Sequence, residues 1–324
     1  MAKAILFYEH GGPEVLKVEE LDPGRPEPGE AQVRHTAIGL NYIDVYDRTG
    51  LYPSELPSGL GREAAGVITA LGRRVRGLKV GDRVAYVHSR PGAYCEIRNV
   101  PAERLVKVPR AISDEEAAAL MLKGLTAQFL LRRTYRVARG EAILVHAAAG
   151  GVGLLLCQWA KALGAKVIGV VGSDAKAELA RRNGCKHVLV LGREPLAAQV
   201  RKLTQGVGVA VVYDSVGKDT FTDSLDCLRP LGMMVTYGNA SGPPPAVSPL
   251  ELSKRGSLFL TRPTLFNYIA TRQSLDAGAR ELFAAVKSRA VRVRIGQRYA
   301  LTDAAEAHRD LEGRRTTGST VLIP

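Results

Sequence analysis

The chain has 324 residues, 46% hydrophobic and 24% charged, close to the averages of globular proteins. Its 34 glycines and 17 prolines are scattered without a period, which excludes collagen-like and low-complexity architectures. The 45 basic and 32 acidic side chains leave a net charge of +13, but the basic residues are dispersed, which favours a solvated basic surface over a nucleic-acid-binding tail.

The N-terminal residues and the cysteines indicate a cytoplasmic protein. The first apolar stretch is too short for a signal peptide. The cysteines, Cys95, Cys157, Cys185 and Cys227, lie far apart and form no C-x-x-C pair, so neither a disulfide framework nor a zinc cluster is indicated. We therefore expect a protein of the reducing cytoplasm.

Residues 1–120 predict a β-rich domain. Short or alternating apolar runs occur at EVLKVEEL, EAQVRHTAIGL, AAGVITALG and DRVAYVH, with prolines and glycines between them. Turn residues at this density are typical of a mostly antiparallel, barrel-like fold. Ser113 and Glu116 form a capping-box pattern, which predicts a helix leading into a second domain.

Residues 142–160 carry no formal charge, a length that by itself is compatible with a membrane span. The run also holds His146 and the glycines Gly150, Gly151 and Gly153 at its centre. We therefore predict a strand, a glycine turn and a buried helix, with no membrane contact. His146, at the strand end, is expected to be a packed core imidazole.

Six β-branched runs alternate with helical patterns from here on: AILVHAAA, KVIGVVG, HVLVLG, VAVVYDSVG, MMVTYGN and SLFLTRP. They start about 21 to 24 residues apart, which leaves room for a strand, a crossover helix and two loops. Because both faces of a parallel sheet must be covered, the pattern predicts an α/β, doubly wound Rossmann domain with six parallel strands.

The C-terminal part predicts a helix over residues 268–288 and two further strands. The apolar tail GSTVLIP is placed to pair back onto the β-rich domain. We place the β-rich domain at residues 1–125 and 263–324, and the Rossmann domain at 126–262.

The motif HAAAGGVG, at residues 146–153, is the strongest local signal because it follows a strand and opens a helix. In a dinucleotide fingerprint, glycines allow a tight turn, close approach of backbone N–H groups to a pyrophosphate, and tight helix–strand packing. Gly150 and Gly153 match the second and third glycines, whereas Ala148 stands where the first usually lies.

The end of the next strand indicates the cofactor. NAD sites usually place an acid there for the ribose 2′-OH, but KVIGVVG ends without one. Ser173 and Lys176 follow, a hydroxyl and a cation that suit a 2′-phosphate, so NADPH is favoured. The alternative makes Asp174, beside Lys176, the ribose acid.

Several separated motifs together resemble one family: GGPEVL (11–16), IGLNYIDVYDRTGLYP (38–53), PSGLGREAAGVI (57–68), LKGLTA (122–127), HAAAGGVG (146–153), YDSVG (213–217) and YGNASG (237–242). In this order they resemble the zinc-free, zeta-crystallin-like NADPH:quinone oxidoreductases of the medium-chain dehydrogenase/reductase superfamily. The resemblance implies a GroES-like, mostly antiparallel β-barrel beside the Rossmann domain.

The resemblance also implies the site residues. The candidates lining the reaction cleft as catalytic residues are Asn41, Tyr46, Tyr52 and Thr126. The implied NADPH-binding residues are Asn41, Tyr46, Thr126, Gly150, Gly151, Val152, Gly153, Ser173, Lys176, Ser215, Asn239, Ser241, Pro263, Leu265 and Arg314. Leu191 replaces a tyrosine that close relatives place against the adenosine, and Arg193 is a candidate to compensate.

Related zinc enzymes hold a catalytic zinc through a Cys and a His in the corresponding N-terminal motifs. Here these positions read Asn41 and Arg62, and the lobe that carries four cysteines for a structural zinc is missing. The resemblance therefore implies catalysis without a metal. YDSVG contains Asp214, which we interpret as a strand-end acid that caps a loop.

The implied activity is NADPH-dependent reduction of a quinone, by hydride or electron transfer, in a cleft between the domains. Either Tyr46 or Tyr52 hydrogen-bonds a quinone oxygen, or both are core or rim aromatics. One alternative is an enone or enal reductase, which needs a proton donor; another is an NADPH-binding protein that contacts RNA and has weak enzyme activity. A homodimer joined through the edge of the Rossmann sheet is also implied.

Overall fold

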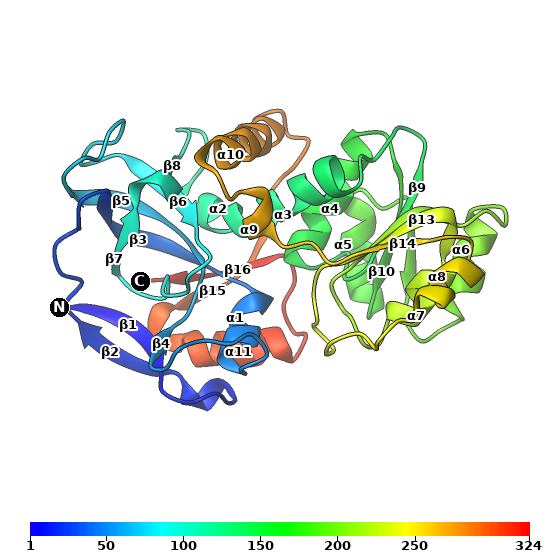
Figure 1. Ribbon diagram of the computed structural model, residues 1–324, viewed down its shortest axis with the longest axis horizontal. Coiled ribbons are helices and arrows are strands. Elements are labelled where there is room, and N and C mark those ends of the chain that lie inside the picture. The colour runs from blue at the N-terminus through cyan, green and yellow to red at the C-terminus, as the bar shows by residue number, and fades with distance from the viewer. The chain divides into compact units, whose positions relative to one another are not determined.

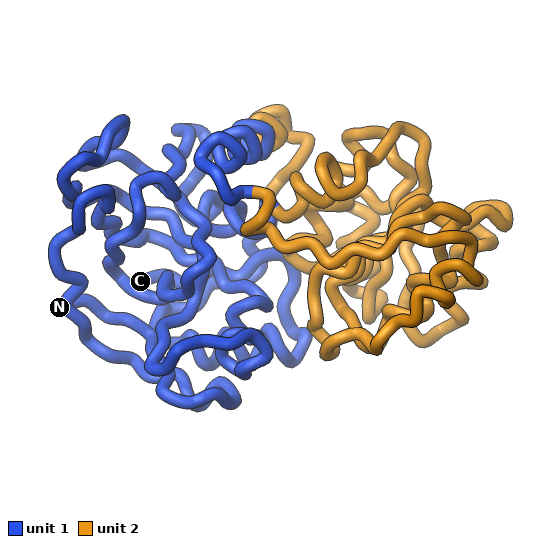
Figure 2. Tube along the Cα trace, viewed as in Figure 1, with its two compact units in different colours: residues 1–125, 269–283, 293–324 blue, residues 126–268, 284–292 orange.

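The computed structural model describes residues 1–324 and divides into two compact units, coloured separately in Figure 2. Unit 1 comprises Met1–Leu125, Ile269–Phe283 and Val293–Pro324. Unit 2 comprises Thr126–Tyr268 and Ala284–Arg292. Two helices, α3 (Met121–Phe129) and α10 (Arg272–Lys287), contribute residues to both units.

Unit 1 is built on a seven-stranded sheet with the order β15-β16-β3-β5-β6-β8, and β7 also pairs with β3. Every strand pair is antiparallel except β15 with β16. The strands are β3 (Glu30–Leu40), β5 (Glu63–Leu71), β6 (Arg83–Val87), β7 (Ile97–Pro101), β8 (Val106–Lys107), β15 (Ile295–Ala300) and β16 (Ser319–Ile323). The predicted antiparallel β domain is confirmed, and so is the pairing of the C-terminal tail, in which Leu322 lies opposite Ile38.

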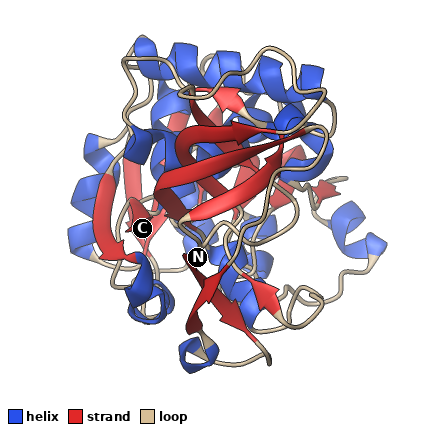
Figure 3. Cartoon of the chain, turned by 90° about the vertical axis from the view of Figure 1, so that its left-hand side faces the viewer, coloured by secondary structure: helices blue, strands red, loops and turns tan.

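A second, three-stranded sheet and several short helices complete unit 1. The sheet has the order β2-β1-β4. Both chain ends, marked N and C in Figure 3, belong to this unit. Its remaining elements are β1 (Ala2–Phe7), β2 (Lys17–Leu21), β4 (Ser58–Gly59), α1 (Tyr42–Arg48), α2 (Asp114–Ala118) and α11 (Ala304–Glu312), with 3-10 turns η1 (Pro13–Val15), η2 (Ala102–Arg104) and η4 (Leu301–Asp303). The predicted capping box opens α2, where the Ser113 hydroxyl accepts a hydrogen bond from the Glu116 N–H at 3.2 Å.

Strand β3 carries the chain from the core of unit 1 to the candidate site. Its first half alternates, with Ala31 and Val33 buried and Arg34 and Thr36 exposed, as expected of a sheet with one solvated face. The second half, from residue 37 to 40, is buried on both faces. The chain therefore enters α1 from a fully packed position.

Unit 2 holds a six-stranded parallel sheet, of which β9, β10, β13 and β14 are labelled in Figure 1. The order of the strands is β11-β10-β9-β12-β13-β14. The strands are β9 (Ala142–Val145), β10 (Lys166–Val171), β11 (His187–Val190), β12 (Val209–Asp214), β13 (Leu228–Thr236) and β14 (Phe259–Thr261). The helical elements are α4 (Gly151–Ala162), α5 (Asp174–Arg182), α6 (Leu196–Leu203), α7 (Phe221–Asp226), α8 (Pro249–Lys254), α9 (Leu265–Tyr268) and the π-helical turn η3 (Leu130–Thr134). The predicted Rossmann sheet is confirmed, and its strand order reverses beside β9, the position where such sheets bind ligands.

The uncharged run at residues 142–160 is divided into β9, the glycine turn and most of α4. None of the helices has the length and apolar character needed to span a bilayer. The helix predicted over 268–288 starts later, at Arg272, because a local cap precedes it: the Ser274 N–H donates to the Thr271 hydroxyl at 3.1 Å, and the Thr271 N–H donates to the Ser274 hydroxyl at 3.2 Å.

Candidate functional site

The turn between β9 and α4 has the features of a phosphate-binding loop. Gly150 is the N-cap of α4, and no side chain caps this helix end. The first backbone N–H groups of a helix have no intrahelical partner and attract anions. A Cβ on Gly153 would collide with the carbonyl oxygen of Ala147, so only glycine fits there. The turn therefore fits the pyrophosphate of a dinucleotide.

The departure of Ala148 from the fingerprint is compensated on the neighbouring strand. Ala148 is fully buried, and its backbone N–H donates to the carbonyl of Val170 at 3.1 Å. A Cβ placed on Gly169 would lie 2.9 Å from the Ala148 methyl. Because Gly169 has no side chain, the turn accommodates alanine in place of the first glycine.

Ser173 and Lys176 lie together at the start of α5, directly after β10. Ser173 is the N-cap, and its hydroxyl oxygen accepts from the Lys176 N–H at 3.4 Å, so the hydroxyl hydrogen remains available to donate to an anion. Asp174 forms an exposed ion pair with Arg193. The carboxylate that the NAD alternative requires is therefore already engaged by a guanidinium.

The loops after β12 and β13 interlock at the same edge of the sheet. A Cβ on Gly238 would lie 2.5 Å from the Ser215 carbonyl oxygen. The Ser241 hydroxyl donates to the carbonyl of Val216 at 2.9 Å and accepts from the Asp219 N–H at 3.0 Å. Because the carboxyl ends of parallel strands meet at one edge, the structure gathers Gly150–Gly153, Ser173, Lys176, Ser215, Asn239 and Ser241 there.

The remaining predicted residues of unit 2 lie on connecting elements. Thr126 is buried on α3. Pro263 lies between β14 and α9, and the buried Leu265 begins α9.

Asp214 and His146 serve the interior of unit 2. The Asp214 carboxylate accepts from the N–H groups of Val216 at 2.7 Å and Gly217 at 3.2 Å, which confirms that it caps the loop. His146 is fully buried, with Nε2 2.8 Å from the Ser224 hydroxyl, and burial lowers the pKa of its imidazole. This confirms the expectation of a packed imidazole.

In unit 1, Asn41 and an aromatic cluster surround the start of α1. Asn41 is the N-cap of this helix and is 5% exposed. The ring of Tyr46, buried on α1, lies 5.5 Å from that of Tyr42 and 5.2 Å from that of Tyr52. The structure therefore places Tyr46 beside Tyr52, on the helix that Asn41 caps.

Glu63 and Lys123 belong to this cluster but were missed by the sequence analysis. The Glu63 carboxylate is fully buried, and Oε1 accepts from Asn41 Nδ2 at 2.7 Å and from Lys123 Nζ at 3.1 Å. Glu63 Oε2 accepts from the Leu122 N–H at 2.6 Å. The available signal was a charged residue within each of the apolar stretches REAAGVI and LKGLTA, because buried charges need partners.

The two positions that hold zinc ligands in related enzymes have other partners here. Asn41 donates to Glu63, and Arg62 forms a buried, bidentate pair with Asp47 at 2.7 and 2.9 Å. No group of three or more His, Cys, Asp or Glu side chains is arranged to hold a metal ion.

Buried ionisable groups also join α1 to the C-terminal helix α11, partly through Tyr94. Asp44 accepts from the Asn41 N–H at 2.8 Å and from the Tyr94 hydroxyl at 2.9 Å, and Tyr94 lies 3.2 Å from His308 Nε2. Burial raises the pKa of Asp44 to about 7 and lowers the pKa of His308 to about 3. Arg48, fully buried, pairs with Glu312 at the end of α11.

Arg314 follows α11 in the left-handed region, with φ 58°. Burial raises the pKa of Tyr42, and the charge of Arg314 acts against this shift. Arg314 therefore lies in the electrostatic environment of α1.

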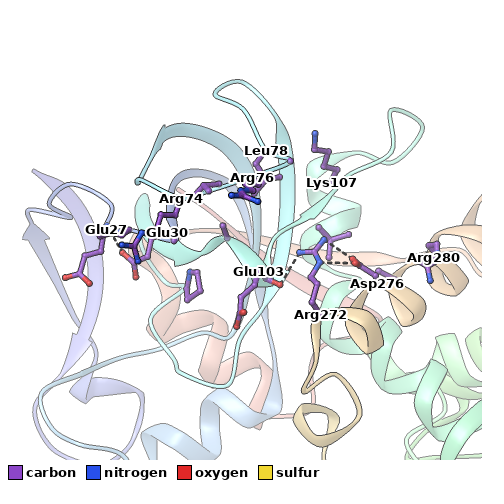
Figure 4. A pocket seen from close by; sticks show the side chains of 18 of the residues that line it. Glu27, Glu30, Arg74, Arg76, Leu78, Glu103, Lys107, Arg272, Asp276 and Arg280 are labelled. Carbon is purple, nitrogen blue, oxygen red and sulfur yellow. Dashed lines mark hydrogen bonds and ion pairs between the residues drawn. The ribbon is translucent and has the colours of Figure 1, made fainter.

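A cavity of about 910 Å³ lies elsewhere in unit 1 (Figure 4). Charged side chains of its lining include Arg74, Arg76, Glu103 and Arg272, and none of the lining residues is a predicted site residue. The Arg272 guanidinium is engaged by Asp276 and by the carbonyl oxygen of Glu103. The cavity and the candidate site therefore share no residues.

Comparisons with known proteins agree with this architecture. Residues 27–110 match the alcohol dehydrogenase GroES-like domain, and residues 151–284 match the zinc-binding dehydrogenase family. A quinone oxidoreductase of Pseudomonas aeruginosa is 54% identical over the full length of both chains. The crystal structure of an Escherichia coli quinone oxidoreductase complexed with NADPH is 49% identical, covers 100% of both chains and superposes with a TM-score of 0.98.

A 2-haloacrylate reductase of a Burkholderia species is also similar, 45% identical over 100% of this chain and 99% of its own length. Full-length identity of about half to named quinone oxidoreductases is far more specific than a shared fold. This chain is an oxidoreductase and belongs to the quinone oxidoreductases of the medium-chain dehydrogenase/reductase superfamily.

Proposed function

We propose that this chain reduces quinones with NADPH and without a metal ion. The observation that carries the cofactor assignment is the uncapped N-terminus of α4 behind a turn that only Gly153 can form, with Ser173 and Lys176 at the end of the adjacent strand. The named quinone oxidoreductases at 50 to 54% identity support the substrate class. The NADPH complex of the Escherichia coli relative supports the choice of nucleotide.

The residues of unit 2 would hold the nucleotide part of the cofactor. The N–H groups of Gly151, Val152 and Gly153 suit the pyrophosphate. Lys176 and the Ser173 hydroxyl suit the 2′-phosphate as a cation and a donor. Ser215, Asn239 and Ser241 would contact the ribose and nearby groups, and the backbone of Pro263 and Leu265 the nicotinamide amide. Arg314 is proposed for the adenine-side phosphates.

The chemistry asks little of the protein beyond position. When bound, NADPH supplies the hydride. A quinone is a strong electrophile, and the negative charge that reduction places on its oxygen is delocalised over the ring. The protein therefore mainly has to align the two reactants and exclude water. Asn41, Tyr46 and Thr126 would hold the nicotinamide half, and a hydroxyl of Tyr46 or Tyr52 would donate a hydrogen bond to a quinone oxygen.

A second candidate activity is reduction of a carbon–carbon double bond conjugated to a carbonyl or carboxylate. The 45% identity to a 2-haloacrylate reductase favours it. That reaction needs a proton at the carbon next to the one that receives the hydride, so it requires an acid in reach of the substrate. We propose a tyrosine hydroxyl of the α1 cluster, that of Tyr46 or Tyr52, as this acid.

Steady-state oxidation of NADPH against ortho-quinones, para-quinones, enones and 2-haloacrylates distinguishes the two activities. We expect turnover with quinones at least tenfold faster than with any enone. Faster turnover of the enones or haloacrylates would replace the proposed substrate class. The purified protein should contain no stoichiometric zinc and keep its activity with a chelator; about one zinc per chain would contradict the metal-free mechanism.

We also propose a homodimer through β14. This strand is the end of the sheet, paired only with β13, and its Phe259 and Leu260 are 56% and 38% exposed. An edge strand with apolar side chains is a template for pairing, and C2 dimers are the commonest assembly. Light scattering should give twice the mass of one chain, and Leu260→Lys should give a single-chain mass. A wild-type monomer at micromolar concentration would contradict the proposal.

A further inference from the structure

We propose that Glu63 is a positioning residue that holds the amide of Asn41 with its oxygen, and not its nitrogen, available to a bound ligand. Asn41 then recognises a hydrogen-bond donor, which at the nicotinamide ring is the NH₂ of the carboxamide and which a quinone does not offer. The inference rests on the proposed function because it takes NADPH as the cofactor.

Both N–H groups of the Asn41 amide are used inside unit 1. Nδ2 donates to Glu63 Oε1 at 2.7 Å and to the Gly39 carbonyl oxygen at 3.3 Å. An amide NH₂ has two hydrogens, so no donor is left for a ligand. The bond to Glu63 is charge-assisted, which makes it the stronger of the two.

The opposite end of the amide is defined by the helix start. Asn41 and Asp44 form a capping box, in which the Asn41 side-chain oxygen faces the N–H of Asp44 and the Asp44 carboxylate accepts from the Asn41 N–H. A carbonyl oxygen has two lone pairs, so one acceptor site stays available after the cap. Rotating the amide by half a turn would place its NH₂ against this N–H and its oxygen against the Glu63 carboxylate.

The surroundings of Glu63 make the arrangement specific for a carboxylate. Oε1 faces two donors, Asn41 and Lys123, and Oε2 faces the Leu122 N–H. A glutamine would direct an NH₂ at a donor in either orientation. Lys123 supplies the counter-charge and is itself held by the Leu40 carbonyl at 3.0 Å.

Gly39 gives a second sign that the site is built around this carboxylate. A Cβ at position 39 would collide with Glu63 Oε1 and with the carbonyl oxygen of Ala118. Gly39, the second-last residue of β3, therefore leaves the space that the carboxylate occupies.

This orientation of the Asn41 amide also limits which reactant Asn41 can bind. Quinone oxygens only accept hydrogen bonds, so the Asn41 oxygen cannot bind them. A hydrogen-bond donor such as the hydroxyl of Tyr46 or Tyr52 must bind them instead.

The test compares NADPH with its reduced 3-acetylpyridine analogue, in which a methyl group replaces the NH₂ of the carboxamide. Dissociation constants are measured by protein fluorescence without a quinone. Both ligands share the pyrophosphate and the 2′-phosphate, so the ratio of their constants cancels general damage to the site. One neutral hydrogen bond predicts that wild type binds the analogue about three- to tenfold more weakly.

Asn41→Ala removes this acceptor and should lower the ratio at least about twofold, while the backbone contacts proposed for Pro263 and Leu265 account for any remainder. Glu63→Gln should do the same through the misdirected amide, and Glu63→Asp, which keeps the buried charge but withdraws it from Asn41, serves if the glutamine variant does not fold. The matched control is Glu115→Gln, whose partner Arg298 is exposed, and it should keep the wild-type ratio.

The outcomes separate the inference from the proposed function. A wild-type ratio near one would show that Asn41 accepts no bond from the carboxamide. A full wild-type ratio in folded Glu63 variants would show that Glu63 does not position Asn41. A wild type that binds NADPH with the predicted ratio but reduces no quinone would overturn the proposed activity and leave the positioning role standing.

Discussion

The proposed nucleotide-binding edge of unit 2 and the α1 site of unit 1 are built from different chemical groups. The edge in unit 2 consists of backbone N–H groups, glycines and short hydroxyl side chains, supplied by loops that directly follow strands. The α1 site consists of two buried ion pairs, Glu63 with Lys123 and Arg62 with Asp47, and of the buried acid Asp44.

The two sites should therefore be sensitive to different kinds of substitution. Backbone N–H groups keep their position as long as the turn keeps its shape, so steric bulk should damage the edge more than a lost charge. A buried charge keeps its position only while its partner is present, because an unpaired ion in the interior is costly. The α1 site should therefore respond to charge removal more than to small changes of volume.

Removing the counter-ion of Glu63 should have the largest effect. We expect Lys123→Met to lower the free energy of unfolding by about 3 to 5 kcal/mol, because the carboxylate stays buried without its cation. Urea denaturation followed by circular dichroism measures the change. The control in unit 2 is Lys254→Met, whose pair with Glu251 is exposed and should contribute less than about 1 kcal/mol. If both variants lost the same free energy of unfolding, the buried pair would be no more important for stability than the exposed one.

Bulk in the glycine turn should be the next most damaging change. Gly153→Ala places a methyl group against the Ala147 carbonyl, so the turn must open and the N–H groups lose their alignment. We expect the dissociation constant of NADPH to rise at least about 100-fold, which corresponds to roughly 2.7 kcal/mol.

Gly172→Ala provides the control for folding, since nothing lies within 4 Å of its added Cβ. Its free energy of unfolding should stay within about 0.5 kcal/mol of wild type. Unchanged NADPH affinity in Gly153→Ala would show that the turn does not hold the pyrophosphate.

Lys176→Ala tests the one charge on which the unit 2 edge is proposed to depend. The dissociation constant of NADPH should rise about tenfold to a hundredfold, whereas that of NADH should stay nearly unchanged because NADH has no 2′-phosphate. Added salt should weaken the preference of wild type for NADPH. On the alternative assignment, Asp174→Ala would selectively weaken NADH binding. Equal losses of both nucleotides in Lys176→Ala would contradict the assignment of NADPH.

The buried acid of the α1 site should show itself in the pH dependence of stability. The raised pKa of Asp44, about 7, means that the folded protein holds a proton that the unfolded chain releases near pH 4, so this group lowers stability as pH rises from about 4 to 7. The pKa values of His308 and His35, lowered by burial to about 3 and about 4, act in the opposite direction below pH 6.5.

Asp44→Asn should therefore make the loss of stability on acidification steeper, by about 1.4 kcal/mol for each pH unit between pH 4.5 and 6.5. Thermal unfolding in buffers across this range measures the slope. The exposed Asp22→Asn should run parallel to wild type. If the stability of Asp44→Asn also ran parallel to that of wild type from pH 4.5 to 6.5, Asp44 would be ionised in the folded protein throughout this range.

The Rossmann domain could be predicted from local sequence patterns, and so could the position of several of its residues at one edge of the sheet. Six strands could be predicted because apolar runs, crossover helices and glycine turns are local patterns with fixed spacing. Residues that directly follow parallel strands, such as Ser173, Ser215 and Ser241, necessarily reach one edge of the sheet. The start of α10 was harder to predict from the sequence, because it depends on the reciprocal cap between Thr271 and Ser274.

The α1 site, in contrast, is assembled by packing between elements that are distant in the sequence. Asn41, Glu63 and Lys123 come from the N-cap of α1, the first residue of β5 and the first turn of α3, and no spacing rule joins them. The room that Gly169 leaves for Ala148 also depends on packing, because it joins strand β10 to the turn after β9. The physical reason is the same in both cases. Local periodicity reports which face of an element is buried, whereas the partner of a buried charge or methyl group depends on which elements pack against each other.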